Sequence, residues 1–395
     1  QSVWLEGVGE YYPIDFRLTP CIERGSLKVE ITLNELPANG SVRLSASMDG
    51  KPAARQEIAV TSDRYVQTEL FLRHDETLEG FRLWRPDDPA LYDLRIETLV
   101  DGAIADQVDT YFGMRKIEII RGCVTLNNSP LYQRLVLDQG YWPDGLLTAP
   151  SDDALRRDVE LTLAMGYNGA RKHQKFEDPR YLYWADKLGL LVWGELPSAY
   201  WLRDSQKRSM MRDLSEAIRR DYNHPCLITW VPINESWGVP FIQTQREAQQ
   251  LADALYHMIH ALDGTRPVSV NDGWEQTCTD LVTIHDYTGW PESLTDAYQD
   301  RERLLNGNSG HWKLTTAVGY DNLGKPMLLT EYGGIAMAKD AGGGNWGYNG
   351  AEQDVAAFLR RFEAITQAFK HLPGFSGYCY TQLTDVFQEV NGLLD

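Results

Sequence analysis

The sequence predicts two domains, a small β-sandwich over residues 1–112 and a (β/α)₈ (TIM) barrel over residues 113–395. Two observations support this fold class. Apolar residues alternate with period two in the first part, whereas short apolar strands alternate with amphipathic helices in the second. The chain of 395 residues is also long enough for two or three domains.

The amino-acid composition of the chain disfavours some classes of binding partner. Hydrophobic residues make up 43 % of the chain and charged residues 24 %, which is an ordinary globular balance. The formal net charge of −18 disfavours nucleic acid and anionic membranes, since both would be repelled. No apolar run is long enough to span a bilayer. The five dispersed cysteines form no CxxC pair, so we expect free thiols.

The sandwich is predicted from short strands and tight turns. Leu27, Val29, Ile31 and Leu33 alternate with polar residues, and the stretch 42–46 repeats the pattern. Asp-Gly pairs follow at 49–50 and 101–102, where hairpin turns are expected. The Cys…Trp…Cys spacing of antibody domains is missing, so an antibody-type domain is not expected.

The barrel is predicted from eight strands separated by helices or long loops. One helix is expected near 152–165, and another begins at Asp178-Pro179 and ends at Gly189. Candidate strands occupy 131–137, 167–171, 190–196, 227–233, 267–271, 281–286, 326–331 and 375–382. A doubly wound sheet is the alternative, but it needs a ligand-binding turn after its first strand. We find no such turn.

A barrel carries its active site at the carboxyl ends of its strands, so the residues that end each strand are the candidates. Polar and aromatic side chains end six of the eight expected strands. They are Arg171 and His173, Glu195, Asn234 and Glu235, His285 and Tyr287, Glu331, and Tyr380 with Gln382.

Glu235 and Glu331 suggest glycoside hydrolysis, which needs one carboxyl group to protonate the leaving oxygen and a second to act on the anomeric carbon. Asn234 is placed to bind the sugar 2-hydroxyl. Trp201, Trp237 and Trp290 follow strand ends, and Trp346 lies at the tip of the glycine-rich loop 342–347, where rings can stack on a sugar. An isolated Asn-Glu pair is common, and each aromatic residue alone is more often a packing residue.

Two rival functions remain open from these residues. A metal-dependent barrel hydrolase would need a cluster of His and Asp at the strand ends, where we find only His173 and His285; we therefore expect no metal and no other cofactor. A non-catalytic carbohydrate-binding protein would need sugar contacts but no pair of carboxylates. A carbohydrate is the expected partner in either the enzyme or the binding protein.

Several stretches together resemble glycoside hydrolase family 2, the family of β-galactosidases, β-glucuronidases and β-mannosidases. The resemblance covers nearly the whole chain. It rests on Val3-Trp4-Leu5-Glu6, the stretch LWRPDDPALY at 83–92, FGMRKI at 112–117, the segment 230–235, and Thr330-Glu331-Tyr332-Gly333. It implies that the sandwich is immunoglobulin-like and precedes a TIM-barrel catalytic domain.

The resemblance implies a retaining exo-β-glycosidase that works by double displacement. Glu331 would be the nucleophile and Glu235 the acid and base. Asn234 would bind the 2-hydroxyl, and Arg171 with Tyr287 would orient the nucleophile. His173 and Glu195 would line the sugar site. The family is compatible with a homo-oligomer.

The sequence also departs from the family pattern. It begins Gln1-Ser2-Val3-Trp4, with no Met or leader, which predicts a fragment lacking the family's N-terminal jelly-roll domain and leaves the compartment open. Lys172-His173-Gln174-Lys175 follows Arg171 where the family often has Ser-His-Tyr-Pro. The Asn-x-Lys carboxylate reader of β-glucuronidases is not evident near 389–391. A uronic acid substrate is therefore less expected than a neutral sugar.

Overall fold

The computed structural model describes residues 3–72, 80–306, 313–340, 343–370 and 374–394. The chain divides into two compact units. The first comprises residues 1–116 with 185–189 and 220–226, and the second comprises 117–184, 190–219 and 227–395. The domain boundary between residues 112 and 113 remains our proposal.

The first unit is built on two antiparallel sheets. One has the order β1-β2-β5 and the other β4-β3-β8-β9. The strands are β1 (Pro13–Cys21), β2 (Ser26–Leu33), β3 (Gly40–Met48), β4 (Lys51–Val60), β5 (Tyr65–Phe71), β8 (Tyr92–Val100) and β9 (Ala103–Phe112), with a short hairpin of β6 (Trp84–Arg85) and β7 (Asp88–Pro89). This confirms the predicted sandwich.

The alternation in the sequence becomes the core of this unit. The side chains of Leu27, Val29, Ile31 and Leu33 are at most 1 % exposed, because they all point to the same face of β2. Both expected hairpins form. Asp49 and Gly50 have φ of 51° and 75°, and the pair at 101–102 has φ of 49° and 79°. These values suit the tight turns that match strand twist.

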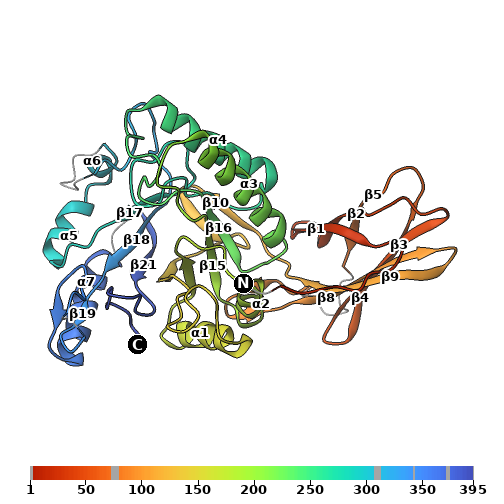
Figure 1. Ribbon diagram of the computed structural model, residues 1–395, viewed down its shortest axis with the longest axis horizontal. Coiled ribbons are helices and arrows are strands. Elements are labelled where there is room, and N and C mark those ends of the chain that lie inside the picture. The colour runs from red at the N-terminus through yellow and green to blue at the C-terminus, as the bar shows by residue number, and fades with distance from the viewer. Residues whose placement is uncertain (1–2, 73–79, 307–312, 341–342, 371–373, 395) are drawn as a thin grey trace. The chain divides into compact units, whose positions relative to one another are not determined.

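The second unit contains a seven-stranded parallel sheet in the order β16-β15-β14-β13-β21-β18-β17 (Figure 1). Its strands are β13 (Gln133–Asp138), β14 (Gly169–Lys172), β15 (Leu191–Glu195), β16 (Leu227–Val231), β17 (Val282–His285), β18 (Met327–Gly333) and β21 (Phe375–Thr381). The first of these strands along the chain, β13, pairs with the last one, β21. This is the winding of a barrel, so the doubly wound alternative is wrong.

The expected fifth strand at 267–271 does not form as a regular strand. The segment 267–273 bonds to β16 through the amide of Ser269 and the carbonyl of Trp230, 3.0 Å apart. On its β17 side, side chains take the place of some backbone partners. The amide of Val270 donates to Thr279 Oγ1 at 3.1 Å and that of Gly273 donates to Thr283 Oγ1 at 3.0 Å, while the amide of His285 donates to the carbonyl of Gly273 at 3.3 Å. The segment therefore connects the two outer strands of the sheet without a continuous ladder.

Helices lie around the parallel strands (Figure 1). They are α1 (Asp152–Ala164), α2 (Pro179–Leu188), α3 (Asp204–Asp221), α4 (Arg246–Leu262), α5 (Pro291–Tyr298), α6 (Arg301–Leu305) and α7 (Val355–Lys370). The two predicted helices correspond to α1 and α2. Ser151 caps α1 by accepting from the amide of Ala154, and Pro179 begins α2.

Shorter elements complete the second unit. They are β10 (Ile117–Ile120), β11 (Cys123–Leu126), β12 (Ser129–Pro130), β19 (Ala336–Met337) and β20 (Ala351–Glu352). All five cysteines lie in described segments and are free thiols, as expected. Among the described helices, none combines the length and the apolar character that crossing a bilayer would require.

Candidate active site

The two candidate glutamates lie close together in the second unit. Glu235 follows β16, and Glu331 lies within β18. Three atoms lie within 4.8 Å of one another: a carboxylate oxygen of Glu235, a carboxylate oxygen of Glu331 and a ring nitrogen of His285. The Glu235 side chain is 25 % exposed, whereas that of Glu331 is 6 % exposed. Their surroundings therefore differ, as two carboxyl groups with different tasks require.

The backbone at Glu235 has an unusual conformation. Glu235 and Ser236 have φ of 51° and 59°, in the left-handed region that non-glycine residues rarely adopt. The amide of Glu235 donates to the carbonyl of Asp272 at 2.9 Å, and the amide of Ser236 donates to Asn271 Oδ1 at 2.9 Å. These bonds hold the turn, which projects the Glu235 carboxylate into the cavity. Such outliers often mark functional sites.

Glu331 is held by hydrogen bonds to both carboxylate oxygens. Arg171 Nη1 donates to Oε1 at 2.8 Å, and the Tyr287 hydroxyl donates to Oε2 at 2.6 Å. Although burial opposes ionisation, the charges of His285, Arg171 and His173 lower the pKa of Glu331 to about 2. The group is therefore ionised at neutral pH, which is the form a nucleophile needs.

Arg171 is the central cation of the site. It is fully buried at the end of β14. Its Nε donates to Glu195 Oε2 at 2.8 Å and its Nη2 donates to Asn234 Oδ1 at 2.8 Å, while Nη1 lies 3.1 Å from Asp272 Oδ2. One guanidinium group thus links the ends of β14, β15, β16 and β18 with the segment 267–273, which its rigid fork of donors allows.

His285 lies between carboxylates at the end of β17. Its Nδ1 is 2.8 Å from Glu235 Oε1, and its Nε2 is 2.8 Å from Asp272 Oδ2. Although burial opposes ionisation of Asp272, the charges of Arg171 and His285 hold the pKa of this carboxyl group well below its usual range. Asp272 is therefore a permanent anion behind the histidine.

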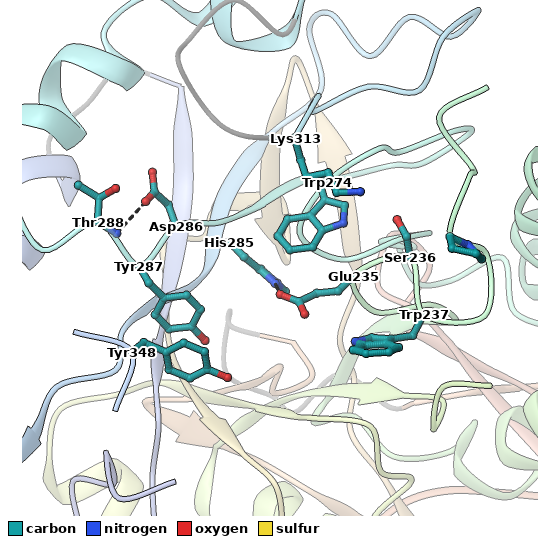
Figure 2. Close-up of a pocket in the computed structure, with 11 residues that line it drawn as sticks. Glu235, Ser236, Trp237, Trp274, His285, Asp286, Tyr287, Thr288, Lys313 and Tyr348 are labelled. Atoms are coloured by element: carbon teal, nitrogen blue, oxygen red, sulfur yellow. Dashed lines mark hydrogen bonds and ion pairs between the residues drawn. The ribbon is translucent and has the colours of Figure 1, made fainter. Parts of the chain in front are cut away.

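A cavity of about 730 Å³ opens in front of these groups. Figure 2 shows the Glu235 carboxylate beside the His285 ring, with Trp237 and Trp274 on either side. The Tyr287 and Tyr348 rings stack at 3.8 Å between centroids with an interplanar angle of 10°. The remaining lining residues are Ser236, Pro240, Asp286, Thr288 and Lys313. A cavity with aromatic walls and a few polar groups is typical of a small-ligand site.

A chain of amides and one carboxyl group extends from the end of β21. Gln139 Nε2 donates to Gln382 Oε1 at 2.8 Å, and Gln382 Nε2 donates to Asn391 Oδ1 at 2.8 Å.

Burial and the negative charge of Glu331 raise the pKa of Glu389. Burial and the charges of Glu389, Glu331 and Glu235 raise the pKa of Tyr348. The negative charges of three carboxyl groups therefore act on Tyr348, which lines the cavity.

Most of the predicted site residues come together. Arg171, Asn234, His285 and Tyr287 contact one or both glutamates or their shared partners. His173 Nδ1 is 3.8 Å from Glu331 Oε1. Trp346 is 44 % exposed and meets Tyr348 edge-on at 5.0 Å, although Gly342 of its loop lies outside the described residues.

Two predicted substrate contacts need correction. Tyr380 packs edge-on against Phe362 of α7 at 4.9 Å and against Tyr332 at 5.4 Å, so its ring points toward the helices and away from the glutamates. Glu195 is fully buried, and its oxygens accept from Arg171 and from the amide of Gln174. Glu195 therefore supports Arg171 instead of lining the cavity.

Sequence reasoning missed several residues of the site. Asp272, Trp274, Lys313, Tyr348 and Glu389 were not among the candidates. Asp272 ends the fifth barrel segment, so the strand-end rule would have found it if applied there. Tyr348 and Glu389 lie in loops, and Lys313 follows a stretch outside the described residues. For these three residues the sequence carries no local signal.

The cluster of Glu235, His285 and Glu331 has the spacing of metal ligands. However, both ring nitrogens of His285 face carboxylate oxygens at hydrogen-bond distance. A histidine binds a metal only through an unprotonated nitrogen. The donor set therefore fits an imidazolium between carboxylates, and it does not fit a metal centre.

Fold and cavity together define a (β/α)₈-barrel protein with a paired-carboxylate site. Two family models match the chain: "Glycosyl hydrolases family 2" over residues 13–115, and "Glycosyl hydrolases family 2, TIM barrel domain" over residues 148–355. The second alone spans more than half of the chain. The chain belongs to glycosyl hydrolase family 2, as the resemblance indicated.

Curated relatives carry names from that family. A putative β-glucuronidase of Formosa agariphila is 26 % identical over 76 % of this chain and 37 % of its own length. A β-galactosidase of Vibrio cholerae is 29 % identical over 82 % of this chain and 31 % of its own length. This chain thus spans about a third of the length of those two relatives.

Solved structures share the fold. A β-galacturonidase of Eisenbergiella tayi, bound to galacturonate, superimposes with a TM-score of 0.73 over 95 % of this chain and 66 % of its own. The sequence identity is 20 %. At that identity the similarity establishes the architecture, and the substrate has to be argued from the cavity itself.

Proposed function

We propose that this chain is a retaining exo-β-glycosidase that removes a terminal β-linked sugar. The observation that carries the proposal is the separation of the two carboxylates, which have oxygens within 4.8 Å of each other. Retaining enzymes hold their carboxyl groups about 5–5.5 Å apart, whereas inverting enzymes need about 6.5–9.5 Å to admit a water molecule.

The surroundings of the two glutamates suggest their tasks. Glu331 is ionised, nearly buried and oriented by Arg171 and Tyr287, so we assign it as the nucleophile that forms the glycosyl-enzyme. Glu235 is more exposed and has a polar partner in His285, so we assign it as the acid and then the base. Asn234 lies beside Glu235, and we assign it to the sugar 2-hydroxyl.

A panel of nitrophenyl β-glycosides tests this function. We expect turnover of one sugar among galactoside, glucuronide, mannoside and glucoside, and NMR of the first-formed product should show the β-anomer. The assay is run on this chain and on the full gene product if the gene encodes more. A chelator should leave the rate unchanged, in contrast to a metal-dependent hydrolase. A first-formed α-anomer would contradict the retaining mechanism.

The charge of the cavity favours a neutral sugar over a uronic acid. The negative charges of Glu389, Glu331 and Glu235 all act on Tyr348 in the cavity wall, and they would repel a substrate carboxylate beside it. Lys313 lines the cavity as well, but its ammonium lies 3.1 Å from Glu275 Oε1, which offsets its charge. We therefore propose that Glu389 disfavours anionic sugars.

Replacing Glu389 tests this selectivity. We expect Glu389→Gln to raise kcat/KM for the glucuronide relative to the best neutral glycoside by about tenfold, equivalent to about 1.4 kcal/mol. The matched control is Glu352→Gln, because Glu352 is also a partly exposed glutamate of the second unit but ends the short strand β20 and pairs with Arg361 at 3.0 Å. An unchanged ratio in Glu389→Gln would mean that another group selects the sugar.

A further inference from the structure

Each ring nitrogen of His285 lies at hydrogen-bond distance from a different carboxylate. Nδ1 lies 2.8 Å from Glu235 Oε1 and 3.5 Å from Glu331 Oε1, and Nε2 lies 2.8 Å from Asp272 Oδ2. Ionised carboxylates only accept hydrogen bonds, and a neutral imidazole has a single N–H. Both 2.8 Å contacts can be hydrogen bonds at the same time in two cases only. Either the ring is an imidazolium, or the ring is neutral and the Glu235 carboxyl group carries the proton that it shares with Nδ1.

The charged groups around His285 support the imidazolium. Glu235 faces it from the turn after β16, Asp272 from the segment 267–273, and Glu331 from β18. Arg171, with His173 beyond it, opposes them from β14. The His285 side chain is 1 % exposed, and Trp274 meets the ring edge-on at 5.6 Å. Although burial opposes the charge, Glu331, Asp272 and Glu235 raise the pKa of His285 to about 10.

This arrangement bears on the acid step. A glycosidase acid must deliver a proton to the leaving oxygen, but next to an imidazolium at 2.8 Å the Glu235 carboxylate is the acceptor and carries no proton of its own. We propose that His285 stores the proton that Glu235 delivers in the first step, and that Asp272 positions His285 for this task. The inference rests on the proposed glycosidase function and assigns His285 as a positioning residue that acts through Glu235.

The proton balance is complete without any other reactant. The proton on Nδ1 passes to the Glu235 carboxyl group, which turns about its terminal bond toward the glycosidic oxygen. The bond from C1 to that oxygen breaks as Glu331 bonds to C1, and the leaving alcohol keeps the proton. His285 is then a neutral ring, and its Nε2–H still donates to Asp272. In the second step, water bonds to C1, Glu331 is released, and the proton of the water returns through Glu235 to His285.

The pH profile of kcat/KM tests the inference, because it reports groups of the free enzyme. Because folding raises the pKa of His285, the ring keeps its proton until the pH rises above the pKa of the folded state. Wild-type activity should therefore persist to alkaline pH, with its basic limb near pH 10. In His285→Gln the limb should move down by about two pH units or more, since carboxyl groups ordinarily lose their protons below imidazolium. Asp272→Asn should move it in the same direction.

The leaving group provides a second readout that a merely structural role would not move. His285→Gln should lower kcat/KM for a poor leaving group such as methyl by about 10²-fold, in the range of general acid catalysis. A dinitrophenyl glycoside, which leaves without a proton, should lose less than about tenfold by the same reasoning. The matched control is His260→Gln, because His260 also pairs with an aspartate, Asp280, at 2.8 Å but lies on α4. It should leave both readouts unchanged.

NMR of ¹⁵N-labelled histidine separates this inference from the proposed function. The His285 signals, assigned by their loss in His285→Gln, should show two protonated nitrogens at pH 8. This test needs no turnover and also serves if His285→Gln is inactive. A ring that is neutral at pH 8, or a basic limb unmoved in both variants, would overturn the inference. An imidazolium in a wild-type chain that hydrolyses no glycoside would instead count against the glycosidase function.

Discussion

Replacing Glu331 by Gln should lower turnover by roughly 10⁴- to 10⁶-fold, the scale seen when a nucleophile that acts as a unit with its partners is removed. The loss should be similar for good and poor leaving groups, because no glycosyl-enzyme forms without the Glu331 carboxylate. Steady-state rates with dinitrophenyl and methyl glycosides measure it. Gln keeps the size of the side chain, so the hydrogen bond from Tyr287 can persist.

Glu235→Gln should behave differently from Glu331→Gln. The poor leaving group should lose about 10²- to 10⁴-fold in rate, whereas the dinitrophenyl glycoside should still form a glycosyl-enzyme, which mass spectrometry can detect. Azide, which needs no general base, should speed the release of that intermediate.

The matched control for both glutamate variants is Glu160→Gln, because Glu160 is a glutamate on α1 whose partner is Arg156. It should turn over both substrates at the wild-type rate. Near-wild-type rates in Glu331→Gln or in Glu235→Gln would contradict the assigned roles.

Replacing Arg171 by Met should lower the free energy of unfolding by about 3–5 kcal/mol, because it leaves buried carboxylates without their cation. Arg171 is fully buried and lies within 2.8–3.1 Å of Glu195, Glu331 and Asp272. Arg171→Lys should recover only part of the loss, since an ammonium cannot reproduce the planar fork of donors. Urea and thermal unfolding measure the change.

The stability loss in Arg171→Met should depend on pH with a definite sign. The pKa of Glu331 falls from 4.5 to about 2 in the folded protein, partly through Arg171. That contribution to stability is present above pH 4.5 and is lost as the pH falls toward 2. The difference between wild type and variant should therefore shrink in acid.

Arg95→Met is the matched control for Arg171→Met. Arg95 pairs with Asp109 at 2.7 Å, but both side chains are at least half exposed. We expect it to leave the free energy of unfolding nearly unchanged, because water and salt screen an exposed ion pair. A similarly small change in Arg171→Met would show that the buried cation is not what holds the site together.

The first unit could be predicted largely from sequence because its signals are local. The alternation at Leu27–Leu33 has the period of a strand with one buried face, and the Asp-Gly pairs supply the positive φ of a tight turn. The strand-end rule likewise located Glu235 and Glu331, which lie 96 positions apart, since parallel strands all end at the same rim of a barrel.

Other features were decided by tertiary structure. Every residue of β21 is buried, so its sequence does not indicate which side chains face the interior. In the structure Thr381 reaches the Tyr287 hydroxyl at 3.2 Å, while Tyr380 points toward α7. The fifth barrel segment has the apolar residues of a strand, but on its β17 side threonine side chains of later segments take the place of some backbone partners.

The sequence by itself therefore determined the two folds and the pair of glutamates. Only the tertiary structure decided that His285 lies between Glu235 and Asp272, and that Tyr348 lines the cavity where the charge of Glu389 acts on it. The physical reason is that hydrophobic periodicity and turn chemistry act between near neighbours in sequence. The charge and proton state of a buried site depend on groups from distant segments, which meet only when the barrel closes.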